Sequence, residues 1–333
     1  MRAKVRGLPK RTSLVRPRNC HTALVRNVQH YRDMVAYPNP LADVAMTEAD
    51  DRSLVRLVQS GSKEALELLL SRHQRWIYNI ALRMLCLPQD AEDATQEILI
   101  RVLTTLSTFR GESEFRTWLY RLAVNHLLNM KRGRAEAREW TFEDYGHELD
   151  RTPDTEPPAP DSERPDAQLL LQEAKIGCTS GMLLCLDREQ RLVYVLGEIF
   201  GVTDRVGADL LEISRDSFRQ KLARSRRDLC NFMQGKCGLV NGSNPCRCAR
   251  KTQGFIKLGY VDPQNLLFAR ERIVQVREVA AKRSEQLDAF FDAYAEVHRS
   301  HPFQESPDVA GSLRNLIERT NFQSAFDLWK GPC

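Results

Sequence analysis

Apolar residues recur every three or four positions along most of the chain, a spacing that predicts amphipathic helices rather than strands. The first two such stretches cover 51–59 and 63–86, and helix-breaking residues follow both. A third starts at 90 with acidic residues, which the positive end of a helix dipole favours. A fourth starts after Ser113, the predicted N-cap. Together these stretches predict a four-helix domain over 46–134.

The periodicity is lost after this domain. Residues 135–166 hold five prolines among many acidic residues, so we predict a flexible acidic linker that cannot bury a core. Helical spacing returns over 167–233, and again in two stretches of 234–333, a C-terminal extension that starts with a cysteine-containing loop. The predicted fold is therefore all-α, with two helical domains joined by a linker and followed by a helical extension.

The second domain contains a helix-turn-helix pattern over 201–229, with a short helix, a turn and a longer basic helix. Phe218, Leu222 and Leu229 mark the buried face of the longer helix. The opposite face carries Asp216, Arg219, Gln220, Ala223, Arg224 and Arg227. A basic helix that presents Arg and Gln near its N-terminal half fits the major groove of DNA. A solvated charge run is the alternative, which the preceding helix and turn disfavour.

The helix after FRGES has an unusual polar face. Beside its apolar face, Trp118, Arg121 and Asn125 form a second stripe at i, i+3 and i+7. An indole, a guanidinium and an amide in a row can stack on an unpaired base, hold a phosphate and contact a base edge. An ordinary solvated face with a half-buried Trp is the alternative interpretation.

At 333 residues the chain is long enough for two or three domains with buried cores. Its net charge of +5 is unevenly distributed along the chain. Residues 1–45 carry nine Lys and Arg against two Asp, a net charge of +7, so the remaining residues carry −2. This head lacks periodicity. It is either a disordered basic arm that touches nucleic acid or an extension upstream of a start at Met46, the interpretation we favour.

Several classes of protein are disfavoured by what the sequence lacks. No apolar run reaches the ~18 residues of a membrane span, and no signal peptide is recognisable, so we expect a cytoplasmic protein without membrane contact. We find no glycine-rich phosphate loop, no HExxH and no nucleophile constellation. We therefore expect no enzymatic activity.

Three segments in order, DAEDATQEILIRVL, FRGES–FRTWLYRLAVN and the helix-turn-helix, resemble the extracytoplasmic-function sigma factors of bacterial RNA polymerase. The resemblance covers roughly 47–133 and 167–232. It implies a protein that binds RNA polymerase core and directs it to promoters, melting the minus-ten element and reading the minus-thirty-five element. An anti-sigma factor or another regulator is a further expected partner. The alternative is a helix-turn-helix regulator, or a metal- or redox-sensing DNA-binding protein, that acts without polymerase core.

The resemblance also implies roles for individual residues. Polymerase-binding positions on the DAEDATQE helix are Asp90, Glu92, Asp93, Gln96 and Glu97. Positions that melt, hold or read the minus-ten strand are Phe109, Arg116, Trp118, Tyr120, Arg121 and Asn125. Positions that contact the minus-thirty-five element, by base or backbone, are Arg215, Arg219, Gln220, Lys221, Ala223, Arg224 and Arg227. Lys131, Arg132 and Arg226 are expected to meet phosphates.

Nine cysteines in a chain without an export signal indicate a reducing compartment, where clustered thiols favour metal or redox chemistry over structural disulfides. Four of them lie close together in the sequence: Cys230, Cys237, Cys246 and Cys248. The turn-rich segment before Cys246 can bring three thiolates together. We expect the neighbouring cations Arg247, Arg250 and Lys251 to lower their pKa values.

This cluster predicts a tetrahedral thiolate site for zinc or copper(I), although sigma function itself requires no cofactor. A disulfide-type redox switch and plain packing are the alternatives. Cys178 and Cys185 are weaker candidates, because residues seven apart on one helix lie about 10 Å from each other. A helix break at Gly181 is needed to bring one of them to the cluster.

Overall fold

The structure of the protein is a computed structural model. It describes residues 48–155, 165–268, 298, 299, 301, 304, 306–309 and 311. The predicted basic head at 1–45, the proline-rich stretch 156–164 and most of the C-terminal extension lie outside the described residues. All described residues belong to Asn39–Cys333, one of the two compact units into which the chain divides.

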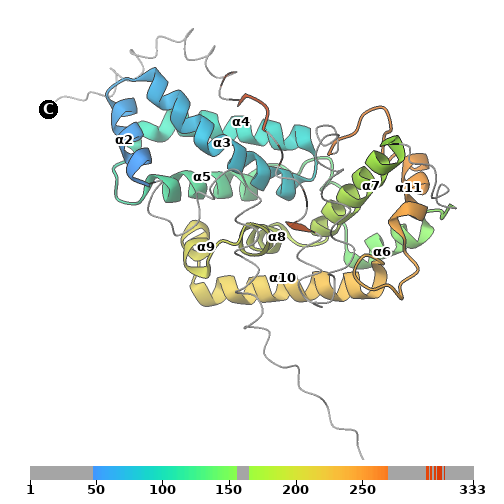
Figure 1. The fold of residues 1–333 in the computed structure, drawn as a ribbon. Helices are drawn as coiled ribbons and strands as arrows, with labels where there is room; N and C mark the ends of the chain where they lie inside the picture. The colour runs from blue at the N-terminus through green and yellow to red at the C-terminus, as the bar shows by residue number, and fades with distance from the viewer. Residues whose placement is uncertain are drawn as a thin grey trace, which may run out of the picture. The chain divides into compact units, whose positions relative to one another are not determined.

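The N-terminal helices bury a common apolar core (Figure 1). They are α2 (Glu48–Gln59), α3 (Lys63–Leu85), α4 (Pro88–Thr105), the 3-10 turn η1 (Leu106–Thr108) and α5 (Phe115–Asn129). Helix α3 packs against α2, α4 and α5 and is buried on most of its surface. The four predicted helices are therefore present. The predicted N-cap is wrong by one residue, because Glu114 precedes α5 and makes no side-chain cap.

The remaining helices complete an all-α fold, as predicted. They are α6 (Phe142–Arg151), α7 (Pro165–Leu184), α8 (Arg188–Tyr194), η2 (Val195–Ile199), α9 (Asp204–Leu211), α10 (Arg215–Lys236) and α11 (Cys248–Lys257). No strand occurs among the residues that the structure describes. Within the same residues, no helix is long and apolar enough to cross a membrane.

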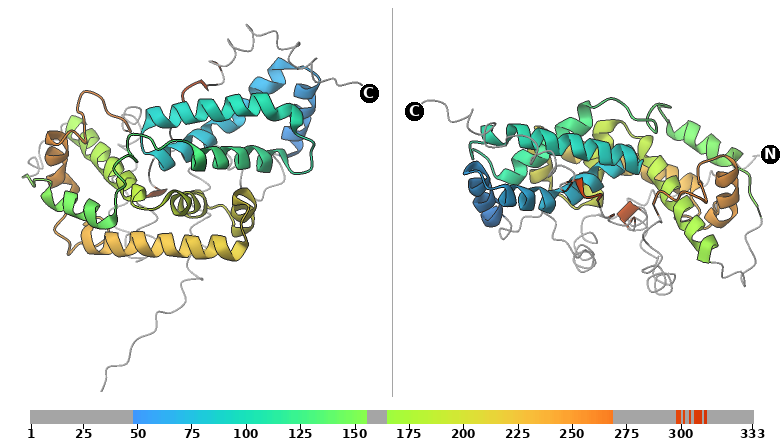
Figure 2. Two further views of the ribbon diagram at one scale, coloured as in Figure 1. Left: turned by 180° about the vertical axis from the view of Figure 1, so that it is seen from behind. Right: turned by 90° about the horizontal axis from the view of Figure 1, so that it is seen from above.

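Helix α5 has neighbours on two sides. It packs against α2, α3 and α4 in the N-terminal core and against α8 and α9 of the helix-turn-helix region (Figures 1 and 2). This double packing leaves α5 less open surface than a helix at the edge of the fold.

The segment predicted as a flexible linker is partly folded. Helix α6 begins after Thr141, whose hydroxyl oxygen accepts a hydrogen bond from the backbone N–H of Asp144 at 3.0 Å. Phe142 and Tyr145 then pack on Phe232 of α10, with ring centroids 5.2 and 6.0 Å away. The proline-rich composition that motivated the prediction begins only after α6, so it describes the second half of the segment.

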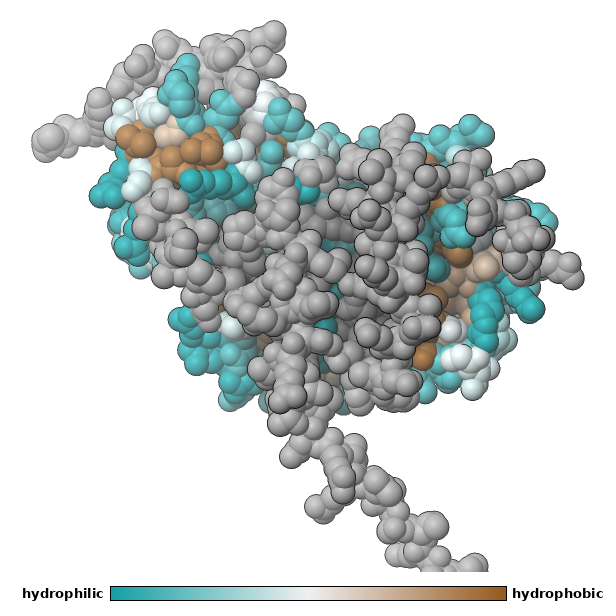
Figure 3. All heavy atoms as spheres, in the orientation of Figure 1, coloured by the Kyte–Doolittle hydropathy of each residue, from teal (hydrophilic) through white to brown (hydrophobic). Residues whose placement is uncertain are grey.

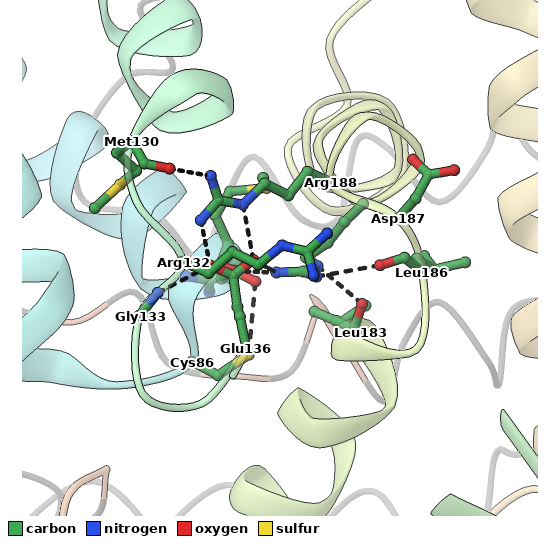
Figure 4. Close-up of polar contacts among 12 residues, drawn as sticks. Cys86, Met130, Arg132, Gly133, Glu136, Leu183, Leu186, Asp187 and Arg188 are labelled. Atoms are coloured by element: carbon green, nitrogen blue, oxygen red, sulfur yellow. Dashed lines mark hydrogen bonds and ion pairs between the residues drawn. The ribbon is translucent and has the colours of Figure 1, made fainter. Parts of the chain in front are cut away.

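Glu136, also predicted to lie in the linker, is the centre of a buried ion-pair network (Figure 4). Arg188 donates from Nε to its Oε1 at 3.0 Å, and Arg191 donates from Nη1 to the same oxygen at 2.8 Å. The two guanidinium groups also bond the carbonyl oxygens that end α3, α5 and α7, namely Met84, Leu128, Met130, Leu183 and Leu186. Cations at the negative ends of three helices stabilise the joint between the two predicted domains.

Helix α8 runs into the π-helical turn η2, where the N–H of Phe200 donates to the carbonyl oxygen of Val195 at 3.0 Å. This wider turn carries Glu198, whose side chain is buried. Its carboxylate pairs with Arg226 of α10 and with Arg299 of the C-terminal extension.

Apolar side chains also reach the surface over α2 and α3 (Figure 3). Leu57 is 51% exposed and Leu68 is 47% exposed on these helices. Exposed leucines are common on the surfaces of helical proteins, and this patch carries no further conclusion.

Candidate DNA and polymerase interfaces

Trp118, Arg121 and Asn125, which we call the α5 stripe, rest on an aromatic cluster. The ring centroids of Phe109 and Trp118 lie 5.4 Å apart, and each lies 5.7 Å from that of Phe115. Phe115 is buried, whereas the other two rings are half-buried. A half-buried indole held against other rings can offer one face to an unpaired base without a large rearrangement.

The other members of the α5 stripe have different surroundings. The side chain of Asn125 is exposed. Arg121 donates from Nη2 to the backbone oxygen of Asp209 at 2.9 Å, and its Nε lies 3.5 Å from Oε1 of Glu212. Both partners are at the C-terminal end of α9, where carbonyl groups favour a cation. The guanidinium of Arg121 is therefore already bound to groups of the helix-turn-helix.

Tyr120 is not on a DNA-binding face, which corrects the prediction for this residue. Its side chain is fully buried, and its hydroxyl lies 3.3 Å from Nδ1 of His73. The other ring nitrogen of His73 lies 3.2 Å from Oδ2 of Asp51, whose Oδ1 accepts from Arg72 at 3.0 Å. This polar relay joins α2, α3 and α5 inside the core. Tyr120 therefore contributes to the packing of α5.

The charge of this relay depends on pH. Burial raises the pKa of the Asp51 carboxyl, but hydrogen bonds and charges from His73 and Arg72 outweigh it and hold the pKa below its usual value. The resulting stabilisation is present above the unfolded pKa and is lost as pH falls through the lower folded value. This relay was not predicted from the sequence. The only sign of the relay in the sequence is that polar residues occupy positions on the apolar sides of two helices.

Of the predicted phosphate contacts near α5, Arg116 is the most covered. Its side chain is 14% exposed, and its Nε donates to Oε2 of Glu114 at 2.8 Å. Lys131 and Arg132 are exposed after the helix, and Arg132 pairs with Glu139. A phosphate would have to replace Glu114 to reach Arg116, whereas the two later cations are already at the surface.

Four of the five predicted polymerase-binding residues form one exposed face on α4. They are Glu92, Asp93, Gln96 and Glu97. Ile100, which is 36% exposed, extends this face by one turn. Asp90 differs from the prediction, because its Oδ2 is buried without a hydrogen-bond partner. The same oxygen lies 2.5 Å from the position that a Cβ on Gly133 would take, so this carboxylate points into the protein.

Helices α9 and α10 form the predicted helix-turn-helix. Thr203 and Ser214 cap the two helices through their hydroxyl oxygens. Gly207 lets the helices approach, because a Cβ there would lie 2.3 Å from the ring of Phe218, the buried anchor of α10. The predicted DNA-facing residues that are exposed on α10 are Arg215, Arg219, Gln220, Ala223, Arg224 and Arg227.

Two cations of α10 lie outside this exposed face. Lys221 is half-buried and its Nζ lies 3.0 Å from Oε2 of Glu189 on α8. Arg226 pairs with the buried carboxylate of Glu198, so its predicted contact with the DNA backbone is not supported by its position. Arg219 is exposed but pairs with Asp204 and Asp216, and these partners must be exchanged before it contacts a base.

Comparison with known proteins identifies one of these regions and several relatives. Residues 69–137, from α3 to just beyond α5, match the family model described as Sigma-70 region 2. RNA polymerase sigma-H factor of Pseudomonas aeruginosa is 28% identical over 197 residues, which cover 57% of this chain and 96% of that protein. The ECF RNA polymerase sigma-E factor of Haemophilus influenzae is 29% identical over 184 residues, covering 55% and 95%. The chain thus contains a match to Sigma-70 region 2 and is similar to extracytoplasmic-function (ECF) RNA polymerase sigma factors.

A further relative is the ECF RNA polymerase sigma-E factor of Escherichia coli, 28% identical over 193 residues that cover 55% of this chain and 94% of that protein. Among solved structures, that of CnrH in complex with the cytosolic domain of CnrY has 24% sequence identity and a TM-score of 0.40. The match covers 56% of this chain and 97% of the chain in that structure. The comparisons give no support to a regulator that acts without polymerase.

The cysteines of the chain are arranged differently from the prediction. Cys178 on α7 lies near Cys237, Cys246 and Cys248, although α7 is continuous through Gly181. The packing of α11 on α7 brings these thiols together without a helix break. Cys230 instead lies on α10 near Tyr194. Within the described part of the chain, no three His, Cys, Asp or Glu side chains form a group that could hold a metal ion.

The thiols in this region are also less acidic than predicted. Burial, reinforced by the charges of Cys237 and Cys246, raises the pKa of Cys248 to about 12. Burial also raises the pKa of Cys246, and the opposing charge of Lys251 is too weak to reverse this. The ammonium of Lys251 is held by Asp154 at 3.1 Å, and Arg247 bonds backbone carbonyls. Metal binding and redox switching by these thiols stay predictions.

Proposed function

We propose that this sigma factor binds bacterial RNA polymerase core and directs it to promoters, where α5 holds the melted minus-ten strand and α10 reads the minus-thirty-five element. The observation that carries the proposal is the acidic face of α4 beside α5. An acidic surface next to a DNA-binding helix repels DNA, so it calls for a protein partner with a basic surface. Transcription by polymerase places this activity in the cytoplasm.

The proposal assigns different tasks to the two helices. Trp118 supports strand separation by stacking, and Asn125 contacts the edge of an extruded base. On α10, Arg219 and Gln220 contact base edges in the major groove, whereas Arg224 and Arg227 contact phosphates. The sigma factor itself performs no chemistry, because the polymerase makes the RNA. An anti-sigma factor or another regulator remains an expected partner.

Run-off transcription tests the proposal with purified bacterial core enzyme and templates of randomised upstream sequence, whose transcripts are sequenced. The full chain should give transcripts that share a promoter pattern. Asp93→Arg should weaken core binding, because it replaces an attraction by a repulsion. Glu143→Arg, the same reversal on an exposed residue of α6, is the matched control. If both variants bind core like the unmodified chain, α4 is not the docking surface.

A further inference from the structure

A cleft of about 310 Å³ lies where the C-terminal part of α5 packs against α4. This volume is at the lower end of the range for small-molecule sites, about 300–1,000 Å³. Two lining residues, Glu97 and Arg101, lie one turn apart on α4. The others come from the end of α5 and the residues directly after it: His126, Asn129, Met130 and Lys131. We call this site the His126 cleft.

His126 contributes a buried polar group without a partner to the wall of the cleft. Its side chain is 3% exposed, and its Nε2 is buried without a hydrogen-bond partner among the described residues. Oε2 of Glu97 lies 3.4 Å from this nitrogen, but the two atoms form no hydrogen bond. An unpaired buried nitrogen costs free energy, so a ligand atom that bonds it gains more than it would at an exposed side chain.

The charges around the cleft favour an anion. Arg101 and Lys131 are exposed cations, whereas Glu97 is the single acid in the lining. Among the described residues neither cation belongs to an ion pair, so both can bind a ligand without losing a partner. The side chain of Glu97 is 64% exposed and can turn to solvent. The cleft therefore offers two cations and one removable carboxylate.

The position of the cleft at the end of α5 does not oppose this charge. The last carbonyl groups of a helix carry partial negative charge and normally disfavour an anion. In α5 they are bonded by a cation from α8. Arg188 donates from Nη1 to the carbonyl oxygens of Leu128 and Met130, and Figure 4 shows the second of these bonds. Its Nη2 also donates to the carbonyl oxygen of Lys131 at 3.3 Å.

The protonation of His126 is coupled to the charge in the cleft. The charged groups that line the cleft around the ring are Glu97 and Arg101 from α4 and Lys131 from the segment after α5. Burial lowers the pKa of His126, the charge of Arg101 lowers it further, and Glu97 opposes both effects. The imidazole is therefore neutral at neutral pH. An anion would favour the protonated ring and raise its pKa, so the anion should bind more tightly at lower pH.

We propose that the His126 cleft binds the phosphate group of a nucleotide, with Arg101 and Lys131 on the phosphate and His126 donating to it from Nε2. The half-buried thioether of Met130 offers an apolar contact for the base. The nucleotide is either free or part of a DNA strand, since both carry the same phosphate chemistry. The inference goes beyond the proposed function, which gives Arg101 and His126 no task.

Binding and the titration of His126 are measured on the full chain without polymerase. The probes are the common ribonucleoside 5′-monophosphates, the matching nucleosides, which lack the phosphate, and a DNA duplex of randomised sequence. NMR of histidine labelled with nitrogen-15 follows the imidazole pKa values. Monophosphates should raise the pKa of His126, whereas nucleosides should not. Without a ligand, Arg101→Gln should also raise this pKa, which identifies the His126 signal without a substitution in the core.

Two arginine variants test the cleft as the binding site. Arg101→Gln removes a cation at an exposed position and should weaken monophosphate binding about tenfold, the loss expected for one charged hydrogen bond. Arg56→Gln changes an exposed arginine that bonds Ser53 in its own helix, and it is the matched control. The control should bind like the unmodified chain. Circular dichroism compares the helical content of the two variants.

The outcomes distinguish the source of the phosphate from failure of the proposal. A shift of the His126 pKa with the duplex, but not with free monophosphates, would assign the phosphate to a DNA strand. Nucleosides that bind as tightly as monophosphates would overturn the phosphate assignment. An unchanged His126 pKa with every probe, or equal binding by the two arginine variants, would overturn the cleft as a site. None of these results alters the proposed function, which run-off transcription tests separately.

Discussion

Helices α5 and α10 are both predicted to contact promoter DNA, but they expose very different shares of the predicted residues. On α10, six of the seven residues are exposed, and Lys221 is the exception. Of the six residues on or before α5, Asn125 alone is exposed. The difference follows from packing, because α10 faces solvent on one side whereas α5 has helices on two sides. Helical spacing therefore identifies a binding face reliably only on a surface helix.

The largest effect is expected from a substitution on the buried face of α10. Phe218→Ala removes the anchor between α9 and α10 and should cost about 3–5 kcal/mol of unfolding free energy, as large-to-small core changes do. Binding to duplex DNA should be lost with it. Chemical denaturation and a duplex-binding assay measure the two losses. The exposed Arg227→Ala is the control for stability. A Phe218 variant as stable as that control would show that the helix pair does not depend on this contact.

On the covered helix, Trp118→Leu should weaken binding of the melted strand by about 1–3 kcal/mol, the range for loss of one stacked base. Helical content and polymerase binding should change little, because leucine keeps part of the apolar packing. Permanganate reactivity of unpaired thymines in a promoter complex reports the melting. Normal melting in this variant would remove the stacking role of the indole.

Substitution of three arginines on α10 should distinguish base contacts, phosphate contacts and structural ion pairs. Arg219→Ala should cost about 1–3 kcal/mol at one base position and relax preference there, and Arg224→Ala should reduce the salt slope of binding by about 1. Arg226→Ala should lower stability and leave that slope unchanged, because its guanidinium pairs with Glu198. Affinity measured against salt for each variant checks all three, and identical slopes would mean that the helix faces are misassigned.

The smallest effect concerns the residue that the structure moves from the DNA face to the core. Tyr120→Phe deletes the hydroxyl that contacts His73, so it should lower stability by about 0.5–1.5 kcal/mol. Promoter melting should be unchanged, since the ring stays buried. Thermal unfolding and permanganate footprinting measure both. A melting defect without a stability change would return Tyr120 to the DNA-binding set.

Features that depend on local spacing were predicted from the sequence, whereas features that depend on tertiary packing were not. The all-α fold and the helix positions in the N-terminal four-helix domain follow from local spacing and were predicted. The polymerase-binding positions on α4 came from the resemblance instead, and all of them except Asp90 lie on one exposed face. The buried position of Glu136 was not predicted, because a carboxylate in a polar segment becomes buried only when two arginines of α8 approach it. Cys178 joined the other thiols for a similar reason, since the packing of α11 on α7 is invisible in one helix.

The π-helical turn η2 has a genetic consequence. A π turn holds one residue more than an α turn, and each α-helical residue rotates the following side chains by about 100°. We expect a chain shortened by a single codon between Tyr194 and Glu198 to continue as an ordinary helix and to aim Glu198 away from Arg226 and Arg299. A change of length by one residue, without any change of side-chain chemistry, would thus disconnect α10 from Arg299 of the C-terminal extension.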